Sequence, residues 1–280
     1  MESIGKKIQT LRRMKQMTQL QLAEVLSVSA QTVSKWENDL TSPDITLLPM
    51  IARYFGITMD ELFNYRLDYL NYRERFIRFM ADNGVLQFGE FQLKSGRVSP
   101  YLINTGNYRT SSQISRMGEF YAECMREHNV ESDLLVGNTR KEIPVLIATG
   151  LSLYDRYGID MHYDIGIDAG KLTDKAGSVT LIKDTLTSGN TLRQTLDEYN
   201  TGTSQRVSDI IVSVDRMERG KSMSLTARQE IERQYNVKIH TIVTVEDIIF
   251  ALEKGVIGGA EYLEAIKDYQ NSYGGNGNGN

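Results

Sequence analysis

Apolar residues in the first sixty positions recur three or four residues apart, which is the spacing of one helical face. Helix start signals accompany this pattern. Thr18 and Gln21 have the spacing of a capping box, and Ser42 precedes Pro43 as an N-cap residue precedes a proline in the first helical turn. The pattern predicts five short helices, near residues 4–15, 19–26, 30–37, 44–55 and 59–64.

These helices predict a compact bundle over residues 1–66 with a single apolar core. Trp36 belongs to that core, and the carboxylate of the following Glu37 is expected to pair with Arg12 or Arg13. The predicted core consists of Ile8, Leu11, Leu20, Ala23, Leu26, Val28, Val33, Trp36, Leu47, Ile51 and Phe55.

The pattern changes after the bundle. Residues 65–83 are charged and rich in aromatic side chains, and they predict a connecting helix over 67–83. Strand patterns at 133–137, 161–165, 179–182, 209–215 and 238–243 then alternate with helices near 111–128, 143–156, 190–200, 224–235 and 246–254. This alternation predicts an α/β domain with a mainly parallel sheet over 84–272. The Gly- and Asn-rich residues 273–280 predict a disordered tail.

Composition narrows the class of protein. The chain has 280 residues, 40% of them hydrophobic, but no apolar stretch of membrane-spanning length, so we expect a cytoplasmic protein without a membrane partner. One cysteine and three scattered histidines predict no metal site. The net charge is −4, yet residues 1–38 hold six Lys or Arg against three Glu, so basic character is confined to the N-terminal part.

The segment MTQLQLAEVLSVSAQTVSKWEND, at residues 17–39, resembles the phage-repressor type of helix-turn-helix domain. The resemblance implies double-stranded DNA as a partner, with the helix at 30–37 in the major groove. It implies Gln31, Thr32 and Lys35 as base-reading residues, and Gln19 and Ser34 as phosphate or base contacts. The alternative is a solvated helix face in a helical dimerisation module.

A second motif is VTLIKDTLTSGNT, at residues 179–191. An apolar strand leads to an acidic residue, then to a hydroxyl-rich loop with Gly189, and then to a helix. Such a loop offers backbone N–H groups and hydroxyls to a phosphate at a helix N-terminus. The sequence therefore predicts a phosphate site here.

Together with FGEFQLKSGRVSPYLINTG at 88–106 and SVDRMERG at 213–220, this motif resembles the orotate phosphoribosyltransferases over roughly residues 78–270. That family joins orotate to phosphoribosyl pyrophosphate, with Mg²⁺, and works as a homodimer. The resemblance implies a phosphate site formed by Asp184, Thr185, Thr187, Ser188, Gly189 and Thr191.

The same resemblance implies two further groups of ligand contacts. Lys94, Tyr101 and Arg216 match the base side, where cations suit an anionic ring carboxylate. Arg140 and Lys141 match the pyrophosphate side. If the domain is catalytically active, Asp184 and Lys141 are the expected catalytic residues.

Three departures from the family lie around the reaction centre. Lys183 replaces one of two adjacent acidic residues and is expected to oppose the cationic sugar of the transition state. Glu142 replaces a glycine and is expected to repel pyrophosphate. The loop at 164–178 is short, with only Lys171 and Lys175 left of a basic cluster, so it closes the site poorly.

These observations predict a homodimeric DNA-binding transcriptional regulator whose transferase-like domain is a pseudoenzyme. The expected ligand is nucleotide-like: orotidine or uridine monophosphate, phosphoribosyl pyrophosphate, orotate or a guanosine polyphosphate. No cofactor is expected, except Mg²⁺ if phosphoribosyl pyrophosphate binds. Two alternatives remain open, an active orotate phosphoribosyltransferase that carries a regulatory DNA-binding domain and a DNA-binding scaffold whose second domain only dimerises.

Overall fold

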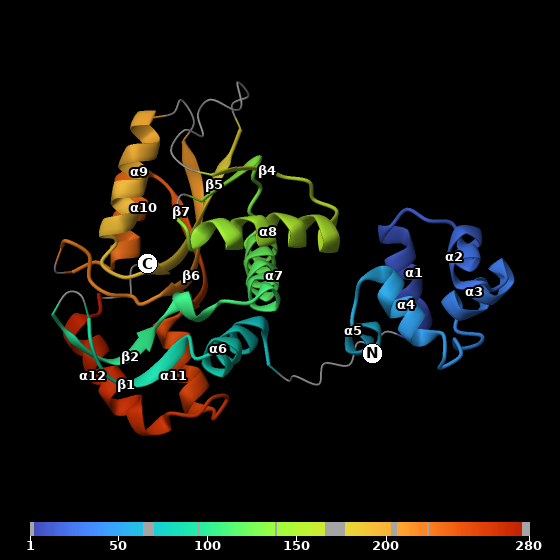
Figure 1. The fold of residues 1–280 in the computed structure, drawn as a ribbon, viewed down its shortest axis with the longest axis horizontal. Coiled ribbons are helices and arrows are strands. Elements are labelled where there is room, and N and C mark those ends of the chain that lie inside the picture. Colours follow the sequence, from blue (N-terminus) through green and yellow to red (C-terminus); the bar gives the residue numbers. More distant parts are fainter. Residues whose placement is uncertain are drawn as a thin grey trace. The chain divides into compact units, whose positions relative to one another are not determined.

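The computed structural model describes residues 3–63, 70–93, 96–137, 139–165, 177–202, 206–222 and 224–275. The chain divides into two compact units, unit 1 (Met1–Tyr69) and unit 2 (Leu70–Asn280), and each is considered by itself (Figure 1). Within the described ranges, no helix combines the length and the apolar character needed to cross a membrane.

Unit 1 contains the five predicted helices. They are α1 (Ile4–Met14), α2 (Gln19–Leu26), α3 (Ala30–Glu37), α4 (Leu48–Phe55) and α5 (Met59–Leu62). Thr18 and Gln21 form the predicted capping box at the start of α2. Ile8, Val33 and Trp36 are buried in the core, as expected. Leu20 was wrongly assigned to that core: it is 58% exposed, and Leu22, which faces the other way on the helix, is fully buried.

The start of α4 differs from the expectation of a helix over 44–55. Pro49 lies in the first turn of α4, where its missing N–H costs nothing. A helix that began near Asp44 would place Pro49 in its second turn. There, proline could not donate the helical hydrogen bond, and its ring would clash with the carbonyl four residues earlier. The Asp44 side chain instead accepts hydrogen bonds from the Thr46 N–H and hydroxyl, which form a local turn before the helix.

Unit 2 opens with α6 (Tyr72–Asp82) rather than with a helix from residue 67. Asn71 is extended and forms a capping box with Glu74, so the helix begins directly after Asn71. An antiparallel pair, β1 (Leu86–Gln92) and β2 (Val98–Ile103), follows and was not predicted as strands.

A five-stranded sheet forms the centre of unit 2. Its strands are β3 (Leu134–Gly137), β4 (His162–Ile165), β5 (Val179–Leu186), β6 (Val207–Asp215) and β7 (Lys238–Thr244). Their order is β4-β3-β5-β6-β7, and every neighbouring pair is parallel. This confirms the predicted fold class of a helical domain followed by an α/β domain. The carboxyl ends of the strands meet at one edge, where ligands bind in open α/β sheets.

Helices cover both faces of this sheet (Figure 1). One face packs on α7 (Ser111–Glu127), α8 (Glu142–Tyr157) and α11 (Val245–Glu253), and the other on α9 (Asn190–Gly202) and α10 (Ala227–Tyr235). The last helix, α12 (Leu263–Tyr273), contacts β2. The tail was predicted to begin at residue 273, but Tyr273 is helical and Gly274 forms a β-bridge with Glu218.

Candidate functional site

Helix α3 carries most of the residues expected to contact DNA. Gln31 and Lys35 are exposed and, being four residues apart, lie on one face, while Thr32 and Ser34 are half-buried. Ser29 caps the helix by accepting the Thr32 N–H at 3.1 Å. The cap gives α3 a defined start, which fixes the direction of its exposed face.

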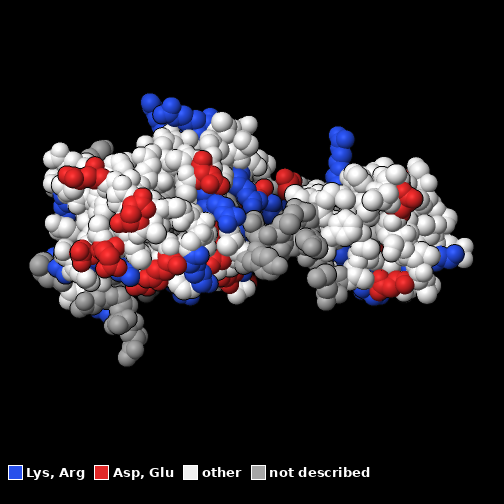
Figure 2. Space-filling model, turned by 90° about the horizontal axis from the view of Figure 1, so that it is seen from below, with Lys and Arg blue, Asp and Glu red and all other residues white. Residues whose placement is uncertain are grey.

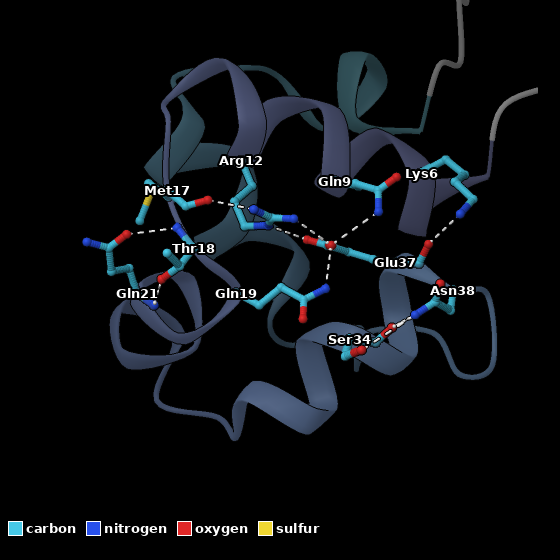
Figure 3. Close-up of polar contacts among 10 residues, drawn as sticks. All are labelled: Lys6, Gln9, Arg12, Met17, Thr18, Gln19, Gln21, Ser34, Glu37 and Asn38. Carbon is cyan, nitrogen blue, oxygen red and sulfur yellow. Dashed lines mark hydrogen bonds and ion pairs between the residues drawn. The ribbon is translucent and has the colours of Figure 1, made fainter.

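Gln19, an expected DNA contact, is half-buried and forms a hydrogen bond with a buried ion pair of unit 1 (Figure 3). Glu37 accepts from Arg12 Nε at 2.6 Å and from Arg12 Nη2 at 2.8 Å, which confirms one of the two pairings that the sequence left open. Gln19 Nε2 donates to the same carboxylate at 2.8 Å, and Gln9 Nε2 at 3.4 Å. The carboxylate thereby ties α1 and α2 to the end of α3.

Glu37 stays ionised although it has no exposed surface. Burial by itself raises the pKa of a carboxyl group. Here the hydrogen bonds from Arg12 and Gln19, together with the Arg12 charge, outweigh burial and hold the pKa of Glu37 below its ordinary value. The ionised carboxylate of Glu37 therefore links α1, α2 and α3 through four hydrogen bonds.

In unit 2, the predicted phosphate loop lies between β5 and α9. Gly189 has a φ of +77°, and a Cβ there would lie 2.6 Å from the Ile231 side chain, so the turn requires glycine. The loop lines a cavity of about 420 Å³, hereafter the loop cavity. Thr185, Thr187, Ser188, Gly189 and Thr191 line it, and so do Arg140, Lys141 and Asp184.

Sequence reasoning did not identify Arg193, which supports the loop from within α9. Its Nη1 donates to the Ser188 carbonyl at 3.0 Å, and its Nη2 pairs with Glu230. Arg193 is 4% exposed, so its charge lies beneath the loop rather than in solvent. The signal for it was an arginine one turn after the loop glycine, on the face that packs inward.

Thr105 links the two predicted catalytic residues. Its hydroxyl donates to Asp184 Oδ2 at 3.0 Å and accepts from Lys141 Nζ at 3.4 Å. All three line an adjoining cavity of about 210 Å³. Thr105 stands at the end of the motif at 88–106, but its hydroxyl role depends on the distant strand β5.

The two substituted positions, Lys183 and Glu142, form a buried ion pair. Lys183 Nζ lies 2.7 Å from Glu142 Oε1, and the two side chains are 5% and 2% exposed. Glu142 Oε2 also accepts the Thr139 N–H at 3.1 Å, and Lys183 Nζ donates to Thr195 Oγ1 at 3.4 Å. The sequence presented these residues as two independent charge defects, whereas in the fold their charges neutralise each other.

On the expected base side, Arg216 is buried beside Tyr101. The guanidinium lies 4.2 Å from the Tyr101 ring centre, and it donates to Glu218 at 2.8 Å and to Ser99 at 3.1 Å. Tyr101 has no exposed surface, so it supports Arg216 by stacking. Neither residue lines the loop cavity or the adjoining cavity. Lys94 lies outside the described residues.

The lid residues Lys171 and Lys175 also fall outside the described residues. Within the described part of the chain, no group of three or more His, Cys, Asp or Glu side chains is placed to hold a metal ion. A Mg²⁺ ion carried by ligand phosphates needs only one or two protein carboxylates. Asp184 fits that role, because it lines both cavities and is only half-buried.

Known proteins resemble both units. Residues 8–62 match the helix-turn-helix family. The orotate phosphoribosyltransferase of Shigella dysenteriae is 37% identical over 213 residues, which are 72% of this chain and 98% of that protein. The enzyme of the same name from Colwellia psychrerythraea is 34% identical over 220 residues, covering 73% and 99%.

Solved structures agree with the sequence matches. The crystal structure of orotate phosphoribosyltransferase from Francisella tularensis superposes with a TM-score of 0.64 at 28% identity, over 74% of this chain and 98% of that one. The matched region is unit 2, and it covers 98% of each of these two relatives, from Shigella dysenteriae and Francisella tularensis. The chain thus belongs to the orotate phosphoribosyltransferase family, with a helix-turn-helix domain joined to its N-terminal side.

Proposed function

We propose that this protein is a homodimeric, DNA-binding transcriptional regulator whose orotate phosphoribosyltransferase-family domain binds a nucleotide-like ligand that controls the fit to DNA. The observation that carries the proposal is the contrast within the loop cavity. The phosphate loop keeps its glycine and hydroxyls, while the reaction centre holds a buried Lys183–Glu142 ion pair. The loop thus supports phosphate binding directly, whereas the ion pair bears on turnover in two ways: it occupies part of the reaction centre, and it leaves no unbalanced charge there.

The DNA-binding part rests on α3. Gln31 and Lys35 share its exposed face, and their side chains suit adenine and guanine edges or phosphates. On the face of unit 1 seen in Figure 2, charged side chains are scattered among uncharged ones rather than gathered into a basic stripe. One copy would make few phosphate contacts, so two copies on two half-sites are needed for tight binding.

A ligand can control DNA binding only if it binds one arrangement of the dimer more tightly than another. A ligand that binds equally well to every arrangement of the two DNA-binding domains shifts nothing, however tightly it binds. We expect the ligand to favour one arrangement within the dimer, and hence one spacing of half-sites.

A second candidate function, an active orotate phosphoribosyltransferase, is favoured by one specific observation. The hydroxyl of Thr105 joins Asp184 and Lys141, so both expected catalytic side chains lie in one hydrogen-bonded group beside the cavity. In addition, the pairing of Lys183 with Glu142 removes the unbalanced charge that argued against turnover.

The test uses the full-length protein and DNA duplexes that it selects from a random pool. DNA affinity is measured by fluorescence anisotropy at fixed salt, alone and with orotidine monophosphate, uridine monophosphate, orotate, or phosphoribosyl pyrophosphate with Mg²⁺. Salt must be fixed because phosphate contacts make affinity steeply salt-dependent. Formation of orotidine monophosphate from orotate and phosphoribosyl pyrophosphate is assayed in parallel.

The proposal expects one ligand to change DNA affinity without turnover. Ser188→Ala, which removes a loop hydroxyl, should weaken that response, whereas Ser111→Ala, an exposed serine at the start of α7, should leave it unchanged. Turnover would support the enzyme instead. DNA binding that no ligand alters would support a scaffold and overturn the regulator.

A further inference from the structure

The turn between β3 and α8 already contains an anion of its own. Glu142 is the first residue of α8, and both of its carboxylate oxygens are engaged. Oε1 lies 2.7 Å from Lys183 Nζ, and Oε2 accepts the Thr139 N–H at 3.1 Å. Counted over the whole residue, Glu142 is 3% exposed and Lys183 is 4% exposed, so water does not compete with these bonds.

A backbone N–H in a turn before a helix and a nearby ammonium group are the partners that a bound phosphate group would use. Here both are satisfied by a carboxylate covalently attached to the same turn. An incoming diphosphate would have to displace that carboxylate, because both partners are already bonded to it. Displacement would leave a buried charge without its partner, which is strongly unfavourable.

The second phosphate position in the loop cavity is the phosphate loop itself, which does not contain Glu142 or Lys183. The loop Thr187–Thr191 lies at the N-terminal end of α9, and Arg193 supports it from beneath through the Ser188 carbonyl. The loop therefore offers its hydroxyls and N–H groups to a phosphate, while Glu142 already engages the Thr139 N–H and Lys183 in the turn before α8.

We propose that Glu142, paired with Lys183, closes the diphosphate position, so that the cavity accepts ligands with a single phosphate on ribose and discriminates against ribose 1-diphosphates. The ligand class is the nucleoside 5′-monophosphates and ribose 5-phosphate. This inference rests on the proposed function, since it specifies which nucleotide-like ligand the domain binds. Glu142 and Lys183 act as specificity residues and not as catalytic ones.

The test compares ligands by isothermal titration calorimetry on the full-length protein. The probes are orotidine monophosphate, ribose 5-phosphate, and phosphoribosyl pyrophosphate with Mg²⁺. The main variant is Glu142→Gly with Lys183→Met, which removes the internal anion and its partner together. The control is Glu253→Gly with Lys267→Met, which makes the same charge changes at an exposed ion pair.

The wild type should bind both monophosphates and bind phosphoribosyl pyrophosphate at least about tenfold more weakly, the order expected for one charge-assisted contact. The Glu142/Lys183 double variant should bind phosphoribosyl pyrophosphate about tenfold more tightly than the wild type does. The Glu253/Lys267 double variant should behave as the wild type. If the main variant does not fold, Glu142→Gln with Lys183→Met replaces it and should show the same direction of change.

The outcomes separate this inference from the proposed function. Equal wild-type affinity for phosphoribosyl pyrophosphate and the monophosphates would overturn the inference and leave the regulator intact. If the wild type binds none of the probes and no ligand alters its DNA affinity in the anisotropy assay, the proposed function fails. In that case, recovery of phosphoribosyl pyrophosphate binding in the double variant would still support closure by Glu142, and its absence would overturn both.

Discussion

Glu37 binds four residues of unit 1, three through its side chain and one through its backbone carbonyl. Arg12, Gln19 and Gln9 donate to its carboxylate, and Lys6 Nζ donates to its carbonyl at 2.7 Å. Because the group is buried, each missing partner leaves an unsatisfied charge or dipole. A residue that the sequence identified only as an ion-pair partner thus connects α1 and α2 to the end of α3, the helix that we propose reads DNA.

The stability of unit 1 should depend on the ionisation of Glu37. Its folded-state pKa lies below the ordinary value of 4.5, so the stabilisation is fully present above about pH 4.5 and is lost as pH falls through the folded-state pKa. At pH 7, Glu37→Gln should lower the free energy of unfolding by about 3–5 kcal/mol.

Thermal unfolding of the wild type and the Glu37→Gln variant from pH 7 to pH 3 measures this effect. The difference between their melting temperatures should narrow below pH 4.5. A difference that stays constant over the whole range would show that Glu37 contributes through packing and not through charge.

Base recognition should depend on Gln31, which is exposed on the capped helix α3. Gln31→Ala should weaken binding to the selected duplex by about 1–3 kcal/mol and relax the preference at one base pair. Competition with single-base variants of the duplex measures both effects. The same substitution at the exposed Gln194 on α9 is the control, and a uniform loss on all duplexes would assign Gln31 to a phosphate contact.

At the scale of elements, the Lys183–Glu142 pair joins the start of α8 to β5 across the edge where ligands bind. A buried pair is costly to break but adds little over a well-packed apolar pair, because burial removes both charges from water. The same two residues thus fix the turn before α8 and decide which anions can enter it.

A double-mutant cycle separates these contributions. Lys183→Met alone should destabilise unit 2 by about 3–5 kcal/mol, and Lys183→Met with Glu142→Leu should recover most of that loss. Urea unfolding gives the four free energies. Arg228→Met with Glu232→Leu, at a partly exposed pair on α10, should show a coupling of only about 0.3–0.5 kcal/mol. Comparable coupling at both pairs would refute a special role for the buried one.

At the scale of the whole molecule, the proposed coupling between DNA binding and ligand binding must be reciprocal. If a monophosphate changes DNA affinity by some factor, the selected duplex must change monophosphate affinity by the same factor, for which about 5–150-fold is typical. Titration of ligand into the protein with and without saturating duplex measures the second factor. Agreement of the two factors supports one linked equilibrium, and a mismatch would indicate that the ligand also binds the DNA complex elsewhere.

Much of this architecture was predictable from local patterns. Strands β3 and β5–β7 and helices α7–α11 follow from alternation of apolar runs, and the phosphate loop follows from the sequence around Gly189. The start of α6 was missed although its signal was present, since Asn71 and Glu74 have capping-box spacing. The strands β1 and β2 were missed because a short, half-buried hairpin has no clear period of burial.

The sequence by itself determined the two units, the helix-turn-helix motif, the parallel sheet and the phosphate loop, because periodicity, caps and loop chemistry act between residues close in the chain. Only the tertiary structure decided what the exceptional residues mean. Lys183 and Glu142 are separated by 41 positions, and Thr105 and Asp184 by 79, yet each pair is in contact. Whether a buried charge is a defect or half of an ion pair depends on its neighbour in space, and no local pattern specifies that neighbour.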